Sequence, residues 1–402
     1  MNDSSNILKE RTQTSIMNTY GRYPLALASG KGCALFDLDG REYLDLLAGI
    51  AVTGLGHCHP EITKALGEQA AKLVHVSNLF FTEPAVELAE RLLATWPEGK
   101  DGKVFFCNSG AEANEGAIKL ARRFMRKVRG EDRFEIITLT NSFHGRTLAT
   151  LTATGQDKVK EGFAPLPEGF TTVAAGNLDA LKAAITEKTA AVLLEAIQGE
   201  GGVKPFPAEY LRGVEALCRK KGILFMVDEI QTGLCRTGKW WAHQYFGLTP
   251  DVVTVAKSLA NGLPMGAIMA SGAVAKGFEP GSHATTFGGT PLAAAAAAKT
   301  LEIMKRDQLA EQAKRLGAFA ATLFKDVAKS HPGTIKEVRG LGLMIGIELA
   351  VDGQKVWEKL LERGFILNLT QGTVLRLLPP LIITQAQLER FARALGDVLK
   401  DL

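Results

Sequence analysis

Two side chains that could do chemistry stand where short apolar runs end. Asp228 follows the run 223–227, and Lys257 follows the run 252–256. A carboxylate can pair with a protonated ring nitrogen and keep a pyridine electron-withdrawing. A lysine with small neighbours leaves room for a cofactor, and partial desolvation would lower its pKa towards nucleophilicity. Either residue alone is more often a surface or structural side chain, so further groups must serve the same chemistry.

Two short motifs could supply those groups. Ser109-Gly110-Ala111 opens a predicted helix, whose unpaired backbone N–H groups and dipole favour an anion such as a phosphate. Helix capping is the alternative explanation. Phe143-His144-Gly145-Arg146 adds a flat ring, which could stack on a cofactor, and a guanidinium, which could hold a substrate carboxylate through two parallel hydrogen bonds.

Buried strands that alternate with helical patterns must position these residues. The apolar runs at 104–107, 191–194, 223–227 and 252–256 each end in a polar or glycine-rich turn. This pattern is typical of a mixed or parallel sheet wrapped by helices in an α/β fold. Ligands gather at the carboxyl ends of such strands, which is where the chemical groups stand.

A change of pattern in the last quarter of the chain predicts a second unit. Residues 58–306 would form a large cofactor-binding domain, and residues 307–402 a smaller α+β domain. The segment 34–44 reads as a hairpin with an Asp39-Gly40 turn. We expect residues 1–57, which contain this hairpin, to pack with the smaller domain.

The composition excludes several classes of protein. Apolar residues make up 46% of the 402 residues and the formal net charge is only +4, so disorder and nucleic-acid binding are not expected. Five cysteines without a CxxC pair argue against a disulfide framework or a cysteine zinc site. No secretory signal and no apolar stretch of about 20 residues is visible. We therefore expect a cytoplasmic protein without a metal and without a membrane segment.

Three nucleotide- or metal-like motifs lack part of their mechanism. The glycine-rich stretch 233–239 has P-loop spacing, but Trp240 replaces the hydroxyl that should hold magnesium. The glycines at 340, 342 and 346 miss the dinucleotide spacing by one residue, so tight packing explains them better. His57-Cys58-His59 has no second ligand pair nearby, and a turn is the better explanation.

The motifs, taken in order, resemble those of the class III (ω-amino acid) aminotransferases, which belong to fold type I of the pyridoxal-phosphate enzymes. The similarity runs from about Tyr20 to the C-terminus, and within the family it is greatest to the enzymes that act on acetylornithine. The matching segments are Asn108-Ser109-Gly110-Ala111-Glu112-Ala113-Asn114-Glu115, Ser142-Phe143-His144-Gly145-Arg146-Thr147, Glu195-Ala196-Ile197-Gln198-Gly199-Glu200-Gly201-Gly202, Asp228-Glu229-Ile230-Gln231-Thr232-Gly233, Arg236-Thr237-Gly238-Lys239, Ala256-Lys257-Ser258 and Thr285-Thr286-Phe287-Gly288-Gly289.

The resemblance implies that pyridoxal 5'-phosphate is the cofactor. Lys257 would hold it covalently and later act as general base and acid. Asp228 would pair with the ring nitrogen. The other residues implied to contact the cofactor are Ser109, Gly110 and Ala111 at the phosphate, Phe143, Ile230 and Gln231 at the ring, and Thr286, which would reach the phosphate of a neighbouring subunit.

The resemblance also implies substrate contacts and a homodimer with shared active sites. Arg146 would bind the distal carboxylate end of the substrate, and Arg376 the α-carboxylate of glutamate or 2-oxoglutarate. Glu200 would neutralise Arg376 while an ω-amine donor is bound and then swing away. Thr285 would lie close to the substrate of the neighbouring subunit. The family usually has a proline where this chain has Ala196, and we expect a slightly freer loop there with unchanged chemistry.

The implied reaction transfers the terminal amine of N2-acetylornithine to 2-oxoglutarate, giving N-acetylglutamate 5-semialdehyde and glutamate, a step of arginine biosynthesis. Ornithine δ-aminotransferase is the nearest alternative. The resemblance implies that ornithine δ-aminotransferase contacts the free α-ammonium of ornithine with tyrosines from its N-terminal segment. In this chain residues 49–52 carry no phenol, although Tyr20 and Tyr23 lie nearby. Succinylornithine, 4-aminobutyrate and lysine-pathway amines stay open, as does a non-catalytic binding protein, against which the intact Lys257 and Asp228 argue.

Overall fold

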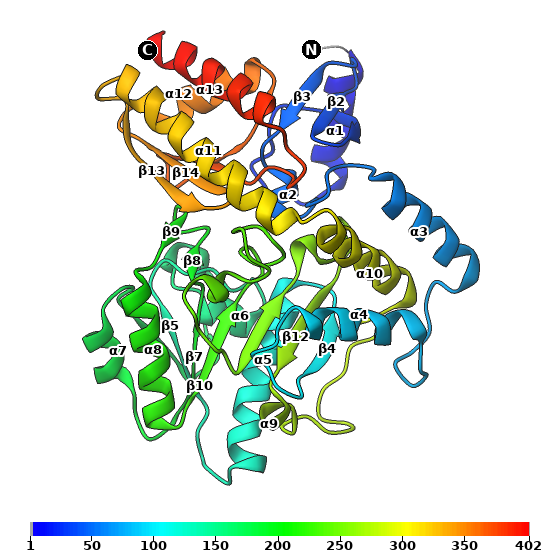
Figure 1. The fold of residues 1–402 in the computed structure, drawn as a ribbon, viewed down its shortest axis with the longest axis vertical. Coiled ribbons are helices and arrows are strands. Elements are labelled where there is room, and N and C mark those ends of the chain that lie inside the picture. The colour runs from blue at the N-terminus through cyan, green and yellow to red at the C-terminus, as the bar shows by residue number, and fades with distance from the viewer. Residues whose placement is uncertain (1–2, 402) are drawn as a thin grey trace.

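A mixed seven-stranded sheet forms the centre of the molecule, which is known from a computed structural model that describes residues 3–401 (Figure 1). The strands lie in the order β4-β12-β11-β10-β7-β5-β6, and β12 runs antiparallel to both of its neighbours while the other pairs are parallel. Their bounds are β4 (Lys103–Cys107), β5 (Glu135–Leu139), β6 (Phe170–Val173), β7 (Thr189–Leu194), β10 (Leu224–Asp228), β11 (Val252–Val255) and β12 (Gly266–Ala270). The predicted α/β class is thus confirmed.

Helices cover both faces of this sheet because its central strands are buried on both sides. Every residue of β7, β10, β11 and β12 is buried, which explains their continuous apolar runs. Leu193 and Met226 pack on one face in the same cluster as α5, whereas Val192 and Val227 pack on the other face with α8. The helices of this part are α3 (Pro60–Lys72), α4 (Glu83–Ala94), α5 (Gly110–Arg123), α6 (Leu148–Ala153), α7 (Leu178–Ala184), α8 (Ala208–Lys221), α9 (Gly272–Ala275) and α10 (Pro291–Arg306).

The C-terminal part is a four-stranded antiparallel sheet, in the order β13-β14-β17-β16, with three helices. Its elements are α11 (Leu309–Ser330), β13 (Ile335–Leu341), β14 (Met344–Leu349), α12 (Gly353–Glu362), β16 (Asn368–Thr370), β17 (Val374–Leu377) and α13 (Gln385–Lys400). This is the α+β pattern expected after residue 307. The exact domain boundaries stay predictions.

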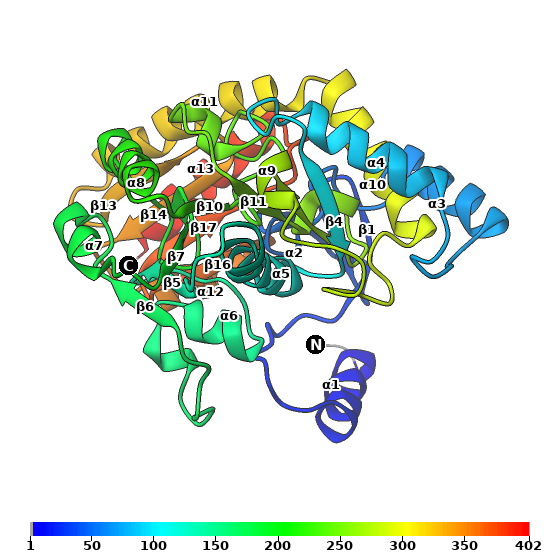
Figure 2. The ribbon, with the colours of Figure 1, turned by 90° about the horizontal axis from the view of Figure 1, so that it is seen from below.

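The N-terminal segment contains the predicted hairpin. It consists of β2 (Ala34–Asp37) and β3 (Glu42–Asp45), whose turn includes Gly40 at φ 79°. β1 (Leu27–Lys31) pairs with β2, and β15 (Phe365–Ile366) pairs in parallel with β3. The hairpin thereby shares a sheet with the C-terminal part of the chain. Figure 2 shows α1 (Asp3–Ser15) on the rim of the molecule, away from the central sheet.

Short irregular elements connect these parts. α2 (Ala48–Ala51) is a left-handed turn, with φ values of 52° to 66° at all four residues. A π-helical turn, η1 (Phe124–Val128), extends α5. The remaining short elements are η2 (Asp157–Val159), β8 (Ile197–Gln198), β9 (Lys204–Pro205), η3 (Ala242–Tyr245) and η4 (Lys257–Ala260).

The nucleotide-like motifs have packing roles. Fully buried Arg236, in the stretch with P-loop spacing, donates to the carbonyl oxygens of Leu343 and Pro379. Gly342 lies against the backbone of the same stretch, where a side chain would collide with Thr237.

Thr290 stands at the N-cap of α10, but its hydroxyl donates to the carbonyl of Val74 instead of capping the helix. Over residues 3–401, the helices are all too short or too polar to cross a membrane.

Candidate active site

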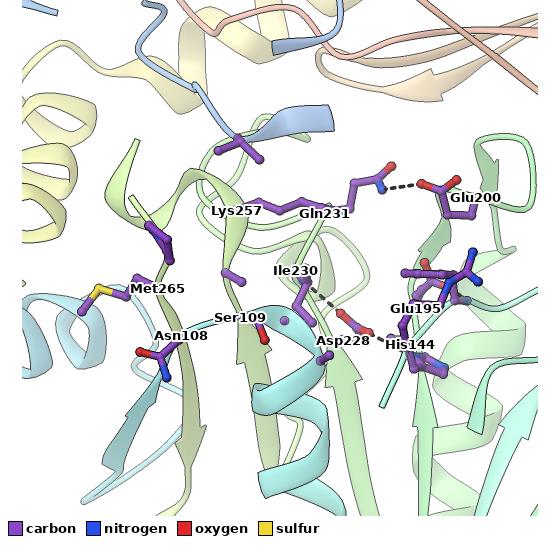
Figure 3. Close-up of a pocket in the computed structure, with 18 of the residues that line it drawn as sticks. Asn108, Ser109, His144, Glu195, Glu200, Asp228, Ile230, Gln231, Lys257 and Met265 are labelled. Atoms are coloured by element: carbon purple, nitrogen blue, oxygen red, sulfur yellow. Dashed lines mark hydrogen bonds and ion pairs between the residues drawn. The ribbon is translucent and has the colours of Figure 1, made fainter. Parts of the chain in front are cut away.

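A cavity of about 410 Å³ opens at the carboxyl ends of the central strands and contains most of the predicted site residues (Figure 3). It lies between the sheet, the start of α5 and the segment that follows β11. The predicted residues that line it are Ser109, Gly110, Ala111, Phe143, Arg146, Glu200, Asp228, Ile230, Gln231 and Lys257. These predicted residues come from five separate stretches of the chain and meet at this edge of the sheet.

Lys257 lies two residues beyond the end of β11, at the start of η4 and not at the strand end itself. Its backbone is in the left-handed region, with φ 46°, which is unusual for a residue with a side chain. The buried hydroxyl of the next residue, Ser258, donates to the carbonyl of Ala51 at 2.6 Å and anchors this turn. Burial lowers the pKa of Lys257, and the nearby carboxylate of Glu200 opposes that shift. The amine is thus poised towards its nucleophilic form.

Asp228 is buried at the end of β10 and is held by three donors. Its Oδ2 atom lies 2.7 Å from the amide nitrogen of Asn114 and 2.8 Å from Nδ1 of His144. Its Oδ1 atom accepts the backbone N–H of Ile230 at 3.0 Å. Figure 3 shows the carboxylate between Ile230 and His144, at the floor of the cavity. The carboxylate is therefore fixed in direction and available to a ring nitrogen.

The start of α5 provides the groups for an anion. Ser109 is the N-cap, and its side-chain oxygen accepts the backbone N–H of Glu112 at 3.1 Å. The capping explanation therefore holds for its hydroxyl, while the helix dipole of the 14-residue α5 still points its positive end at the cavity. A side chain at Gly110 would lie 2.9 Å from Ile230. Glycine thus lets the start of α5 pack directly against the Ile230 side chain.

Arg376 forms a buried ion pair with Glu200 across the two parts of the chain. Arg376, in β17, is 1% exposed, and its Nη1 atom lies 2.6 Å from Oε1 of Glu200. The same guanidinium donates to Gln231 at 3.3 Å and to Asn368 at 2.8 Å. Burial opposes ionisation of Glu200, but the charge and hydrogen bond of Arg376 outweigh it and lower the pKa of this carboxyl. Figure 3 shows Glu200 and Gln231 side by side near Lys257.

Phe143 and Arg146 also line the cavity. The guanidinium of Arg146 lies 5.6 Å from the centre of the Phe143 ring, and Arg146 is exposed at the mouth of the cavity. The backbone N–H of Phe143 donates to Glu195 at 3.1 Å. A flat ring and a reachable cation are thus present as predicted.

Sequence reasoning missed three buried residues of the site, Asn114, His144 and Glu195. Burial raises the pKa of Glu195 to about 7, a shift that the charge of His144 opposes. Burial alone would lower the pKa of His144, but its hydrogen bond to Asp228 and the charges of Asp228 and Glu195 raise it. Asn114 donates to Asp228 from the first full turn of α5. Only the placement of Asn114 and Glu195 within the quoted motifs could have suggested them, because neither residue type alone signals a site.

Thr285 and Thr286 do not line the cavity of their own chain. The Thr285 hydroxyl accepts a hydrogen bond from Asn108 at 3.1 Å, and Thr286 is exposed. The tyrosines of the N-terminal segment are also absent from the lining. Tyr20 is 72% exposed, and the Tyr23 hydroxyl accepts a hydrogen bond from Asn368 at 3.2 Å. Val52 is the N-terminal residue that reaches the cavity.

The donor set fits a flat, anionic, nitrogen-containing ring. A nucleophilic lysine, a fixed carboxylate, an apolar support at Ile230 and a helix start free of side-chain bulk at Gly110 converge on one cavity. Together with a mixed sheet that contains a single antiparallel strand, these groups define a pyridoxal-phosphate enzyme of fold type I.

The family model for class III aminotransferases matches residues 16–399, and the chain belongs to that family. It is therefore a pyridoxal-phosphate-dependent aminotransferase. It is 46% identical over 390 residues to an acetylornithine aminotransferase of Methanocaldococcus jannaschii, with 96% of each chain covered. It is 45% identical to an acetylornithine aminotransferase of Methanothermobacter thermautotrophicus, with both chains covered completely.

Solved structures agree with this assignment. The ornithine aminotransferase of Toxoplasma gondii superposes with a TM-score of 0.94 at 33% identity, covering 99% of this chain and 95% of that one. An acetylornithine aminotransferase of Elizabethkingia anophelis superposes with a TM-score of 0.88 at 30% identity, covering 99% of each chain.

Proposed function

We propose that the chain transfers the terminal amine of N2-acetylornithine to 2-oxoglutarate, giving N-acetylglutamate 5-semialdehyde and glutamate. The observation that carries this proposal is the similarity to acetylornithine aminotransferases, at 43–46% identity over nearly the whole chain. The similarity covers both parts of the chain and therefore every stretch that lines the cavity.

Each residue of the cavity has a role in this reaction. When bound, pyridoxal phosphate withdraws electrons from the carbon that carries the transferred amine. Lys257 would hold the cofactor through its amine and, once that amine is free, would act as the general base and acid that moves the substrate proton. Asp228 keeps the ring nitrogen protonated. Phe143 and Ile230 would hold the faces of the ring, Gln231 would meet the ring hydroxyl, and the start of α5 with Ser109 and Ala111 would receive the phosphate.

The Glu200–Arg376 pair supports the use of two substrates with different charges. An ω-amine donor brings no carboxylate next to its reacting carbon, so Glu200 neutralises a guanidinium that would otherwise be buried without a counter-charge. 2-Oxoglutarate brings its own carboxylate, which takes the place of Glu200 on Arg376. Arg146, exposed at the mouth, meets the carboxylate at the far end of the substrate.

The lining of the cavity favours an acylated donor over free ornithine. A free α-ammonium needs a hydrogen-bonding or negative partner, whereas the residue that the N-terminal segment contributes to the lining is apolar Val52. Tyr20 and Tyr23 point elsewhere. Ornithine δ-aminotransferase activity is the second candidate, because the Toxoplasma gondii enzyme shares the fold at 33% identity.

We also propose that the active enzyme is a cytoplasmic homodimer. Leu79, Phe80 and Phe81 are 86%, 64% and 103% exposed, and Phe287 is 59% exposed. Soluble proteins seldom leave such a cluster uncovered. Exposed Thr286 stands directly beside Phe287, so a second chain seated here would receive it in its phosphate site. All five cysteines are free thiols, which suits a reducing compartment.

Steady-state kinetics with N2-acetylornithine, ornithine and 4-aminobutyrate test the substrate, with 2-oxoglutarate as acceptor. We expect kcat/KM for N2-acetylornithine to exceed that for the other two by at least about tenfold, corresponding to about 1.4 kcal/mol of preference. Lys257→Ala should abolish turnover of all three donors, which excludes a contaminating enzyme. A higher kcat/KM for ornithine would replace the proposal with the second candidate.

A further inference from the structure

The carboxylate of Asp228 distributes its hydrogen bonds unevenly between its two oxygens. Oδ2 receives two side-chain donors, Asn114 at 2.7 Å and His144 at 2.8 Å. Oδ1 receives one backbone donor, from Ile230 at 3.0 Å. Each carboxylate oxygen can accept two hydrogen bonds. Oδ2 is therefore filled, and Oδ1 is the oxygen with a site left for a ring N–H.

The amide of Asn114 is fixed by its own three bonds. Its nitrogen donates to Asp228 and, at 2.8 Å, to the carbonyl oxygen of His144, and its oxygen accepts the Thr254 hydroxyl at 2.8 Å. A flipped amide would turn its oxygen towards two other oxygens, so only one orientation satisfies the site. Asn114 and Thr254 are 0% and 1% exposed, so bulk solvent does not reach either side chain.

Asn114 also links the start of α5 to the Asp228 carboxylate. It lies four residues after Gly110, one turn into α5, so it belongs to the same rigid helix whose first residues face the cavity. Thr254, its partner, lies opposite Asp228 in the register of β10 and β11. The distance between the start of α5 and the Asp228 carboxylate is therefore set by one helix and one amide.

We propose that Asn114 is a positioning residue that directs Oδ1 of Asp228 at the ring nitrogen of the cofactor, acting through Asp228 and not on the substrate. His144 supplies the second donor, but it is a titratable group whose charge varies, whereas the amide donates at every pH. The proposal rests on the role given above to Asp228. It extends that role by naming the residue that makes the carboxylate point in one direction.

The test uses the holoenzyme loaded with pyridoxal phosphate labelled with ¹⁵N in the ring. The chemical shift of the ring nitrogen reports whether that nitrogen is protonated. The rate at which the cofactor passes to an excess of a second, cofactor-free protein that binds it reports how firmly the enzyme retains the cofactor. Asn114→Leu keeps the branched outline of the side chain and removes both donors. Thr254→Val keeps the shape and removes one anchor of the amide. Thr300→Val is the matched control, because Thr300 is an equally buried threonine that bonds within its own helix, α10.

We expect Asn114→Leu to move the ring nitrogen towards its unprotonated shift and to speed cofactor loss about tenfold, the loss expected for a hydrogen bond to a charged group. Thr254→Val should move the ring-nitrogen shift in the same direction by a smaller amount and speed cofactor loss about two- to fourfold. This variant tests the proposal if Asn114→Leu does not fold. Thr300→Val should leave both unchanged. A protonated nitrogen in Asn114→Leu and in Thr254→Val, with unchanged cofactor loss, would overturn the proposal.

Asp228→Asn separates this inference from the function on which it rests. If Asp228→Asn deprotonates the ring nitrogen and the Asn114 and Thr254 variants do not, Asp228 has its proposed role and only the positioning by Asn114 is wrong. If Asp228→Asn also leaves the nitrogen protonated, the role of Asp228 itself is wrong.

Discussion

Lys257 has three properties that suit a lysine that holds a cofactor. Its backbone is held in a left-handed conformation, burial lowers its pKa, and it lines the cavity beside Asp228. We therefore predict that borohydride reduction of the holoenzyme, followed by peptide mass mapping, places the cofactor mass on Lys257. The exposed Lys239, two residues beyond Thr237, serves as an internal reference. Cofactor mass on any other lysine would contradict the assignment.

Glu200 should act as a charge switch because its Oε1 atom lies 2.6 Å from Nη1 of Arg376. In Glu200→Ala, the guanidinium is permanently available to an α-carboxylate, so glutamate no longer competes with an internal partner. The ω-amine donor would instead bind beside an uncompensated charge. We predict that the ratio of half-reaction rates, glutamate over N2-acetylornithine, rises by roughly five- to a hundredfold, or about 1–3 kcal/mol.

A matched variant controls for simple loss of an ion pair. Glu337→Ala removes a carboxylate that lies 2.7 Å from Arg339 in the C-terminal sheet but does not line the cavity. Its rate ratio should equal that of the wild type. An unchanged ratio in Glu200→Ala would make Glu200 a structural carboxylate and would require another gate for the two substrates.

At this scale the sequence predicts the residues that carry the chemistry better than those that hold them. Asp228 and Lys257 follow apolar runs, so strand-end logic locates them before any resemblance is considered. Asn114 and Glu195 have no such signal, because an asparagine on a helix is usually solvated or capping. Their importance appears only when β10, β11 and α5 are packed together and bring Asp228 within 2.7 Å of the amide.

Among the elements, those with a strong period were predictable. The buried strands of the central sheet show as continuous apolar runs, and the Asp39-Gly40 turn marks the hairpin. The direction of β12 was not predictable, since an antiparallel buried strand and a parallel one have the same apolar pattern. The pairing of β15 with β3 was also hidden, because it joins residues more than 300 positions apart.

The left-handed turn α2 is the element that local propensity would not predict. Leu47-Ala48-Gly49-Ile50-Ala51 contains one glycine, yet all of residues 48–51 have positive φ. For a residue with a side chain, this conformation costs roughly 1–2 kcal/mol. The turn is held by Asp45, whose carboxylate accepts the backbone N–H groups of Leu47 and Ala48 at 2.9 and 2.8 Å, and by Ser258, which donates to Ala51. It leads directly to Val52 in the cavity wall.

Ala48→Gly should therefore behave opposite to an ordinary helical substitution. Glycine removes the strain at φ 52° and costs about 0.5–1 kcal/mol of chain entropy, so we predict that the unfolding free energy stays constant or rises by up to about 1 kcal/mol. Ala297→Gly, at an equally buried alanine in the right-handed helix α10, should lower it by about 1 kcal/mol or more. Urea unfolding midpoints of the two variants give the comparison. Equal losses would mean that the turn stores no strain.

For the whole molecule, the proposed homodimer rests on one exposed apolar surface. Thr285 and Thr286 were predicted at an active site, but neither lines the cavity of its own chain, while the apolar cluster formed by Leu79, Phe80, Phe81 and Phe287 is exposed. Sequence reasoning could place the threonines near an active site only through the resemblance. Their geometry makes sense when a second chain covers the cluster, because a symmetric pair would exchange the threonines between the two sites.

Charging the apolar cluster should separate the subunits. In the double variant Phe80→Asp/Phe81→Asp, each interface would lose two aromatic side chains on both subunits, and burying a phenylalanine is worth about 1.5–3 kcal/mol. We predict that the dimer dissociation constant, measured by sedimentation over a dilution series, rises by at least about a hundredfold. Cofactor loss should accelerate as the monomer appears, because Thr286 leaves the phosphate of the other subunit. Phe163→Asp, at a 55% exposed phenylalanine outside the cluster, is the control. It should leave the mass of the sedimenting dimer unchanged. A wild-type chain that sediments as a monomer, or a double variant that remains dimeric with normal cofactor retention, would contradict the shared-site dimer.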